Sequence, residues 1–307
     1  MRMDISDGID IVFMSSSAVF GIFGNGMIIM AIIYDKNLRV TSNIFTACIA
    51  IADICMLCIV NPIAVNNVIQ GRNTLSDVLC DFNAVAIVVT CGVSINTLGV
   101  LAVNRYFYIC NTKWYNVLFT RTKSLIIAFA TWLYCGLWIS PAFYGWTRVN
   151  YNDKMLLCLY DETYSLSYTL SLSAICVGLP AIVTIISYTK TITVIRKSAV
   201  SVTNHKEVKN TSNSKNDAAR NKQRQFRQVL LFFFVSILFL VFWSPHAIAS
   251  VLDSNDSIPP WVIRVTTRLG VSNSCVNCVV YGVLNKHFRS AYKKIIFFWK
   301  RENSLHE

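Results

Sequence analysis

The chain has 307 residues, of which 54% are hydrophobic and only 14% are charged, and its formal net charge is +12. A typical soluble domain has about 25% charged residues, so this chain has too few charges to cover a soluble surface. The same composition excludes a disordered chain, a collagen, a coiled coil and a small disulfide-rich scaffold. What remains is a membrane protein with several spans and a basic side.

Seven segments are long and apolar enough to cross a bilayer, which takes about 20 residues per helix. They cover residues 10–34, 43–68, 78–110, 122–143, 163–195, 223–252 and 259–283. Alternating segments of about ten residues, typical of a membrane β-barrel, are not found. We therefore expect an all-α membrane protein with an amino terminus at 1–9, a seven-helix domain at 10–283 with a polar loop at 196–225, and a tail at 284–307.

The distribution of charge predicts the orientation. If the amino terminus lies outside, 22 of the 28 Lys and Arg residues fall on the cytoplasmic side, as the positive-inside rule requires. The first apolar segment ends without a small-residue cleavage site, so we expect it to remain as an anchor. These features predict a multi-pass plasma-membrane protein with an extracellular amino terminus. The basic loops suit anionic lipid, and nucleic-acid binding is not needed to explain the net charge.

A short amphipathic segment follows the last predicted span. Within 285–299, apolar residues recur at helical spacing with basic residues between them, a pattern typical of a helix that lies in the membrane interface. The apolar positions are Phe288, Ala291, Tyr292, Ile295 and Ile296, and the basic ones are Arg289, Lys293 and Lys294.

Two of the eleven cysteines differ from the rest. Nine lie within or at the ends of apolar segments, where a free cysteine behaves as a small hydrophobic residue. Cys80 and Cys158 lie on the expected outer side, where oxidising conditions favour a disulfide. Asn255 begins the one glycosylation sequon on that side.

Asp53 lies in the middle of the second predicted span, and a charge at such a depth is costly and usually functional. Polar residues on other spans offer amide and hydroxyl oxygens, which together with a carboxylate suit a hard cation. One interpretation is a sodium ion held by Asp53 and Ser94, or water between the helices. The other is a polar network that only aligns helices. The members are Asn25, Asp53, Ser94, Asn273, Ser274 and Asn277.

Two further groups lie in or beside the spans. Arg105 ends the third span, where an arginine can extend to lipid headgroups without any other role. Phe239, Trp243 and Pro245 lie in the sixth span, and a proline within a helix removes a backbone hydrogen bond and bends it.

The ordered set of these residues resembles the rhodopsin-like G-protein-coupled receptors, and within them the melatonin receptors. The first resemblance covers the whole chain and rests on Asn25, Asp53, Cys80, Arg105, Trp132, Pro180, Tyr188, Trp243, Pro245, Asn277 and Tyr281. The second rests on two segments, 104–115 and 273–289. Asn104 before Arg105 and Cys278 after Asn277 depart from the receptor class in the way that melatonin receptors do.

The resemblance implies a seven-helix bundle with a short eighth helix, which binds a small extracellular ligand and activates a heterotrimeric G protein of class Gi/o. It also implies that helix six swings outward. Because neither Asn104 nor Gln225 is charged, Arg105 lacks a charged latch, and we expect appreciable basal activity. The implied switch residues are Asn104, Arg105, Tyr106, Tyr188, Phe239, Trp243, Pro245, Asn277 and Tyr281.

The same resemblance implies a ligand pocket that is largely apolar. Its residues are Ile87, Val88, Cys91, Tyr160, Glu162, Leu172, Cys176, Trp243, His246, Ala247 and Thr267. Val271 stands at the retinal-lysine position, which excludes a retinal cofactor, and Ile87 stands where amine receptors carry an aspartate. Ala142 and Glu162 replace two amides of melatonin receptors, and each unpaired polar group costs about 1–3 kcal/mol. We therefore expect a small amphipathic ligand other than melatonin.

Alternatives remain at this stage. One is a receptor for a short peptide. Another is a cation-coupled transporter with Asp53 as its carrier, although Asp53 is the one acid found in the middle of a span. Motifs of hydrolytic enzymes are not found in the spans, so we do not expect an enzyme. Arrestin is a further expected partner, with phosphorylation at Ser198, Ser201, Thr203, Thr211, Ser212 or Ser214.

Overall fold

The computed structural model describes the backbone of residues 5–204, 212–253 and 257–303, and the side chains of 5–197, 226–253 and 257–297. Some positions of the preceding predictions lie outside these described side chains: Gln225, Asn255 and the six proposed phosphorylation residues.

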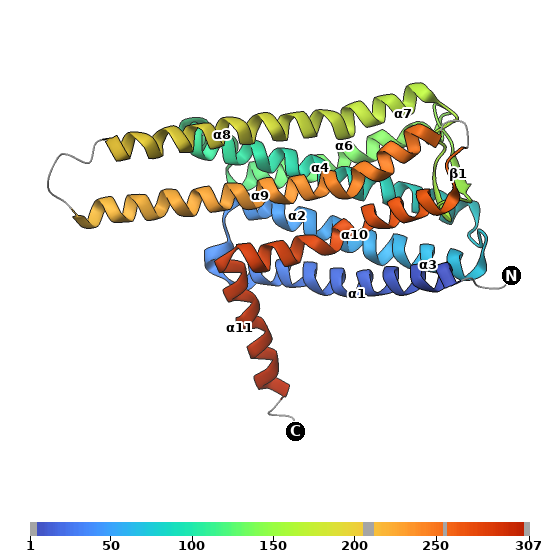
Figure 1. Ribbon diagram of the computed structural model, residues 1–307, viewed down its shortest axis with the longest axis horizontal. Helices are drawn as coiled ribbons and strands as arrows, with labels where there is room; N and C mark the ends of the chain where they lie inside the picture. Colours follow the sequence, from blue (N-terminus) through green and yellow to red (C-terminus); the bar gives the residue numbers. More distant parts are fainter. Residues whose placement is uncertain (1–4, 205–211, 254–256, 304–307) are drawn as a thin grey trace.

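Helices make up almost all of the described chain (Figure 1). The α-helices are α1 (Ile5–Tyr34), α2 (Thr41–Cys55), α3 (Asn61–Gln70), α4 (Asp77–Cys110), α5 (Thr112–Leu118), α6 (Arg121–Ile139), α7 (Leu166–Leu172), α8 (Leu179–Asn204), α9 (Ser212–Leu252), α10 (Pro260–Leu284) and α11 (Lys286–Asn303). Short 3₁₀ turns are η1 (Lys36–Leu38) and η3 (Ser140–Phe143), and π-helical turns are η2 (Met56–Val60) and η4 (Ser173–Gly178). An antiparallel hairpin of β1 (Val149–Asn152) and β2 (Leu157–Tyr160) lies between α6 and α7.

The helices form a seven-membered bundle, which confirms the predicted fold class. The structure joins α2 to α3 through η2, and α7 to α8 through η4, into continuous rods. Six rods in the described part are long and apolar enough to span a membrane. The seventh, α10, carries Arg264, Arg268 and several amide and hydroxyl residues, which lower its mean hydropathy. It nevertheless packs along α1 and α9 as a full member of the bundle.

Two helices extend beyond the predicted spans. The first helix begins at Ile5, five residues before the predicted segment, and its added turn carries Asp7. The segment 196–225, predicted as a polar loop, is helical up to Asn204 and again from Ser212. A helix that has already formed propagates at much lower cost than a new one nucleates, so the spans continue into polar sequence.

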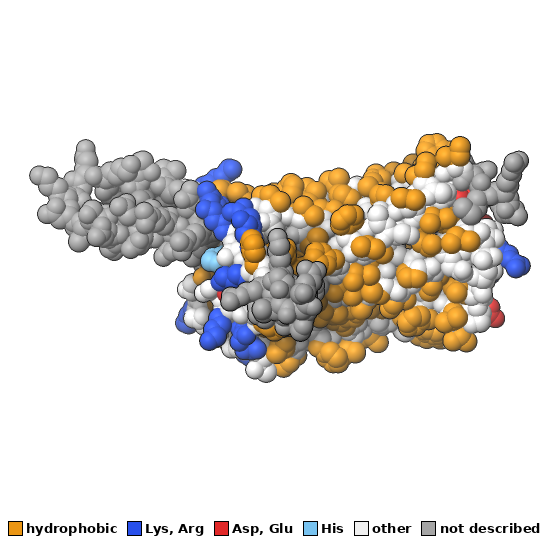
Figure 2. Space-filling model, turned by 90° about the horizontal axis from the view of Figure 1, so that it is seen from below, with side chains coloured by type: hydrophobic (Ala, Val, Ile, Leu, Met, Phe, Trp, Pro, Cys, Tyr) orange, Lys and Arg blue, Asp and Glu red, His pale blue; other side chains and the backbone are white. Residues whose placement is uncertain are grey.

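The two ends of the bundle differ in charge. Figure 2 shows hydrophobic side chains over the middle of the face in view and Lys and Arg gathered at the end where α11 leaves the bundle. We call this the basic end and the opposite one the hairpin end. The start of α11 packs on the bundle through Phe288, Ala291 and Ile295, all buried, as its amphipathic pattern predicts. Its exposed lysines 286, 293 and 294 belong to the basic end.

Three basic side chains at the basic end donate hydrogen bonds to backbone carbonyls of the helix that precedes them. Arg39 donates to Ile33 O, Lys123 Nζ to Val117 O at 2.7 Å, and Arg289 Nη1 to Val283 O at 3.3 Å. Each acceptor lies at the carboxyl end of a helix, where carbonyls lack partners and the helix dipole favours positive charge. These contacts shape the short turns after α1, α5 and α10.

The helices α1 and α10 approach closely because Gly24 of α1, which has no side chain, faces Cys278 of α10. A Cβ at Gly24 would lie 2.1 Å from Cys278 Sγ. Beside this contact, Asn25 Nδ2 donates to Ser274 O at 2.8 Å and Cys275 Sγ to Ser17 O at 3.0 Å. Small residues between membrane helices allow such backbone approach.

We predict that Gly24→Ala lowers the melting temperature of the purified protein, because overpacking of a tight contact costs about 1–3 kcal/mol. Gly26→Ala is the matched control, since a Cβ at Gly26 meets nothing within 4 Å and alanine favours helix. Thermal unfolding in one detergent compares the two variants. Equal melting temperatures for both would show that the α1–α10 contact is not tight.

Candidate functional site

The hairpin end is closed by the turn between β1 and β2. Met155, Leu156 and Leu157 are buried there against side chains of the helices, and Leu156 adopts a left-handed φ of 56°. The predicted disulfide between Cys80 and Cys158 is confirmed and joins the hairpin to α4. The turn is therefore part of the core.

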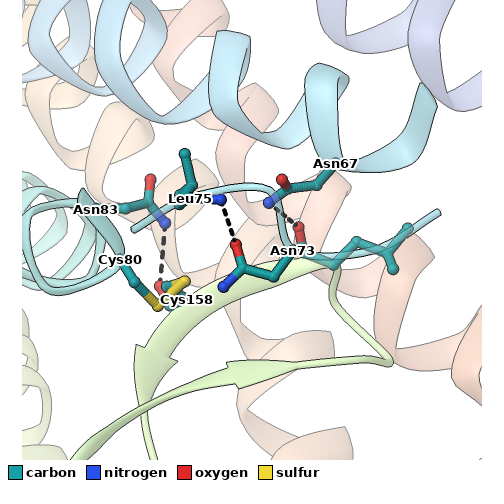
Figure 3. Close-up of a disulfide and its surroundings, with 7 residues drawn as sticks. Asn67, Asn73, Leu75, Cys80, Asn83 and Cys158 are labelled. Carbon is teal, nitrogen blue, oxygen red and sulfur yellow. Dashed lines mark hydrogen bonds between the residues drawn. A yellow bond between two sulfur atoms is a disulfide. The ribbon is translucent and has the colours of Figure 1, made fainter. Parts of the chain in front are cut away.

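Buried side chains bind the backbone carbonyls of this turn. Asn83 Nδ2 donates to Cys158 O at 3.0 Å beside the disulfide, and Asn67 Nδ2 donates to Leu156 O at 3.1 Å (Figure 3). From α10, Arg268 Nη2 donates to Met155 O at 3.2 Å. The hairpin is thus held from α3, α4 and α10. These three donors were not among the predicted site residues, since their partners are loop carbonyls that no sequence motif marks.

Ion pairs also tie the hairpin end together. Lys154 Nζ lies 2.8 Å from Asp253 Oδ2 at the end of α9. Arg264 Nη1 lies 3.0 Å from Asp7 Oδ1, and Asp10 Oδ2 lies 3.9 Å from Arg264 Nε and 4.0 Å from Arg268 Nε. The two arginines of α10 are therefore engaged by acids of α1.

The predicted pocket residues gather below the hairpin. Tyr160 links two groups of side chains, one with Ile87, Val88, Cys91 and Trp243 and the other with Leu172 and Cys176. Its ring meets that of Tyr168 edge-on at 5.4 Å. Thr267 Oγ1 and His246 Nδ1 share a hydrogen bond of 3.3 Å, while Ala247 is exposed.

Glu162 is the acid of this group, and its environment differs from that of its neighbour Asp161. Burial above all, together with the nearby carboxylates of Asp253 and Asp161, raises the pKa of Glu162 to about 7, against a lowering by Ser250. Ser250 Oγ lies beside Glu162 but makes no hydrogen bond of ordinary geometry. For Asp161, burial acts upward, but hydrogen bonds from Thr163 and Arg148 bring its pKa below the usual value. Since a raised pKa means that folding favours the proton, Glu162 weakens the fold as the pH rises from the usual carboxyl range through about 7.

Asp53 lies in the middle of the bundle with several members of the predicted polar network. Asn277 Nδ2 donates to Asp53 Oδ2 at 2.8 Å. A cavity of about 10 Å³, roughly the room of one water molecule, lies against Asp53, Ser94, Asn273 and Ser274. A carboxylate, hydroxyl groups and an amide around so small a space fit a single water or a small hard cation. Asn25 lies outside this lining and connects through its bond to Ser274 O.

Trp243 forms the floor between the pocket group and the cavity of Asp53. Its ring stacks on Phe239 at 6.3 Å and meets His246 edge-on at 6.0 Å. A Cβ at Gly270 would lie 2.8 Å from the Trp243 ring, so this glycine of α10 makes room for the indole. Pro245 lies inside α9 two residues later. Gly270 was missed from the sequence, because its role depends on the facing helix.

Arg105 is buried at the basic end and has neutral partners. Its Nη2 donates to Ser42 Oγ at 2.9 Å, its Nη1 donates to Gln228 Oε1 at 3.4 Å, and its guanidinium lies 4.7 Å from the centre of the Phe232 ring. In the described part of the chain, Arg105 forms no ion pair. The sequence did not single out Gln228 on α9, and the side chain of Gln225 lies outside those that the structure describes.

Three of the other predicted switch residues, Asn104, Tyr188 and Tyr281, lie near Arg105. The hydroxyls of Tyr188 and Tyr281, and both amide atoms of Asn104, are buried without a hydrogen-bond partner. Tyr188 stacks edge-on with Phe233, and Tyr281 with Phe232, both from α9. Tyr106 lies apart, with its ring 6.0 Å from Lys190 Nζ. Unpaired buried polar groups are costly, so this end has hydrogen-bonding capacity that a second packing of the helices can use.

Comparisons with known proteins agree with this geometry. The model of the 7-transmembrane receptor (rhodopsin family) matches residues 24–281. Melatonin receptor type 1A of Mus musculus is 27% identical over 284 residues, which cover 91% of this chain and 77% of that protein. Melatonin receptor type 1C of Gallus gallus is 27% identical over 293 residues, 94% of this chain and 81% of that protein. The crystal structure of squid rhodopsin superposes with a TM-score of 0.84 at 17% identity, over 95% of this chain and 86% of that chain.

Proposed function

Because the chain belongs to the rhodopsin family of seven-transmembrane receptors, we propose that it binds a small amphipathic ligand at the hairpin end and activates a Gi/o protein at the basic end. The observation that carries the proposal is the ordered geometry from Tyr160 through Trp243 to Arg105. Family membership favours a receptor over the transporter considered from the sequence. The charge distribution supports an extracellular hairpin end and amino terminus.

The pocket group favours a small ligand over a peptide. Met155–Leu157 fill the hairpin end and are fixed by the disulfide and by Asn67, Asn83 and Arg268, so a large ligand would have to displace a tied segment. The relatives are melatonin receptors, but Glu162 places a carboxylate where an amide is expected. A small amphipathic molecule other than melatonin remains our proposal.

The mechanism follows from the weak contacts at the basic end. A ligand against His246 and Trp243 shifts the indole across Gly270 and bends α9 about Pro245. Gln228 then moves away from Arg105. The hydroxyls of Tyr188 and Tyr281 can then form hydrogen bonds that they lack in the closed bundle. The opened crevice admits the tail of the G-protein α-subunit, and the basic end attracts an acidic partner by its charge. Arrestin would use the same crevice.

Nucleotide exchange on a purified Gi heterotrimer tests this function, with the full-length protein in lipid nanodiscs. We predict exchange above that of empty nanodiscs without added ligand, and its loss in Arg105→Ala. Gln228→Glu gives Arg105 a carboxylate partner, and because a carboxylate attracts the guanidinium more strongly than a neutral amide oxygen does, we expect basal exchange to fall by roughly fivefold. Gln228→Ala is the neutral control and should exchange at least as fast as the unmodified protein. Basal exchange that is indifferent to Arg105→Ala would overturn the proposal.

We also propose that the cavity beside Asp53 holds a sodium ion that favours the closed bundle. Its oxygen lining and its size support a small cation. An ion that binds the folded state raises stability in proportion to the logarithm of its concentration. We predict that NaCl raises the melting temperature above that in N-methylglucamine chloride of equal ionic strength, and that Asp53→Asn removes the difference. Ser272→Ala, on α10 beside Asn273 but outside the cavity lining, should retain the difference. An identical response to both salts would contradict the sodium site.

A further inference from the structure

Four acids around the hairpin end have basic partners. Asp7 and Asp10 are engaged by the arginines of α10, Asp161 lies 2.8 Å from Arg148, and Asp253 lies 2.8 Å from Lys154. Glu162 is partly buried and forms no ion pair with any residue that the structure describes. Its nearest charged groups are the carboxylates of Asp253 and Asp161. Those two carboxylates are themselves paired with Lys154 and Arg148.

Glu162 lies at the outer edge of the pocket group. It follows Tyr160 by two residues, and Thr169 Oγ1 donates to its backbone carbonyl at 3.1 Å, which fixes the loop against α7. Across from it, Ser250 of α9 has a buried hydroxyl without a hydrogen-bond partner. Residues four apart share one face of a helix, so Ser250 lies one turn beyond His246 on the wall that carries His246 and Trp243. A ligand whose charged group binds at Glu162 can therefore also contact the side chains of the pocket group.

A buried carboxylate without a base is costly, and a cation that binds beside it recovers much of that cost. A neutral amide stabilises the carboxylate less than a cation does, because it has no net charge and brings its carbonyl oxygen as well as its N–H toward the carboxylate. Ile87, the residue of α4 in the pocket group, carries no charge to compete for such a cation. The aromatic rings of Tyr160, Trp243 and His246 supply surfaces for an aromatic body.

We propose that Glu162 is the counter-ion for a cationic aromatic amine, so that the loop after β2 rather than helix α4 selects the charge of the ligand. This inference rests on the proposed receptor function and specifies the chemical class of its ligand.

The test measures binding of tryptamine and N-acetyltryptamine, which share the indole and differ in the charge of the nitrogen. The full-length protein in nanodiscs is used, with thermal stabilisation as the readout. We expect tryptamine to bind at least tenfold more tightly than the amide. Glu162→Gln should remove this preference by weakening tryptamine at least tenfold, with the amide changed less than threefold. Glu162→Asp should keep the preference. Asp161→Asn removes one charge at the adjacent residue, already paired with Arg148, and should leave the ratio within threefold.

Three results would overturn the proposal: equal binding of both compounds to the unmodified protein, binding of neither, or the same change of ratio in Asp161→Asn as in Glu162→Gln. The melting temperature without ligand shows whether each variant folds. Basal nucleotide exchange is measured in parallel and does not depend on the ligand. A failure of the amine preference with exchange intact therefore rejects the ligand class and leaves the receptor function standing.

Discussion

A polar group inside the hydrocarbon layer has to find its partner within the same chain, because no water is present to replace it. In this bundle the partners come from other helices: Asn25 binds the Ser274 carbonyl, Asn277 binds Asp53, and Arg105 binds Ser42. The contacts that hold the helices together therefore lie at the positions that the proposed switch uses. A change of helix packing has to exchange these bonds for others, and the low dielectric makes each exchange energetically significant.

The two ends of the bundle meet this constraint with different strengths. At the hairpin end, a disulfide, Lys154 with Asp253, and amide donors to loop carbonyls fix the turn firmly. At the basic end, α9 is held to Arg105 by a 3.4 Å hydrogen bond that the guanidinium donates to the uncharged Gln228 and by the face of Phe232. A hydrogen bond between a charged and an uncharged group contributes about 1.5–3 kcal/mol. The consequence is a rigid end for recognition and a loosely held end for response.

Hydropathy and charge were sufficient to predict the bundle and its eighth helix, because both depend on averages over many residues. The pairing of Cys80 with Cys158 also followed, since few cysteines lie outside apolar segments. Residues whose roles depend on a facing helix could not be found this way. Gln228 is identified only by its contact with Arg105 across the helices, and Gly270 matters only because Trp243 lies across it. The tethers Asn67, Asn83 and Arg268 bind loop carbonyls, whose direction no side-chain pattern encodes. For Asp53, the sequence predicted a polar network, and the structure adds a small cavity that suits a cation. The bond from Asn277 to Asp53 also joins α10 to α2.

We infer that the uncharged partners of Arg105 leave the helices of the basic end exchanging between two packings. Electron-spin distance measurements test it most directly, with labels carried by unnatural amino acids at the exposed positions Tyr108 on α4 and Arg227 on α9. We predict two distance populations between the labels without ligand, and we expect the longer-distance population to be depleted in Gln228→Glu. A single population that is identical in both proteins would contradict it.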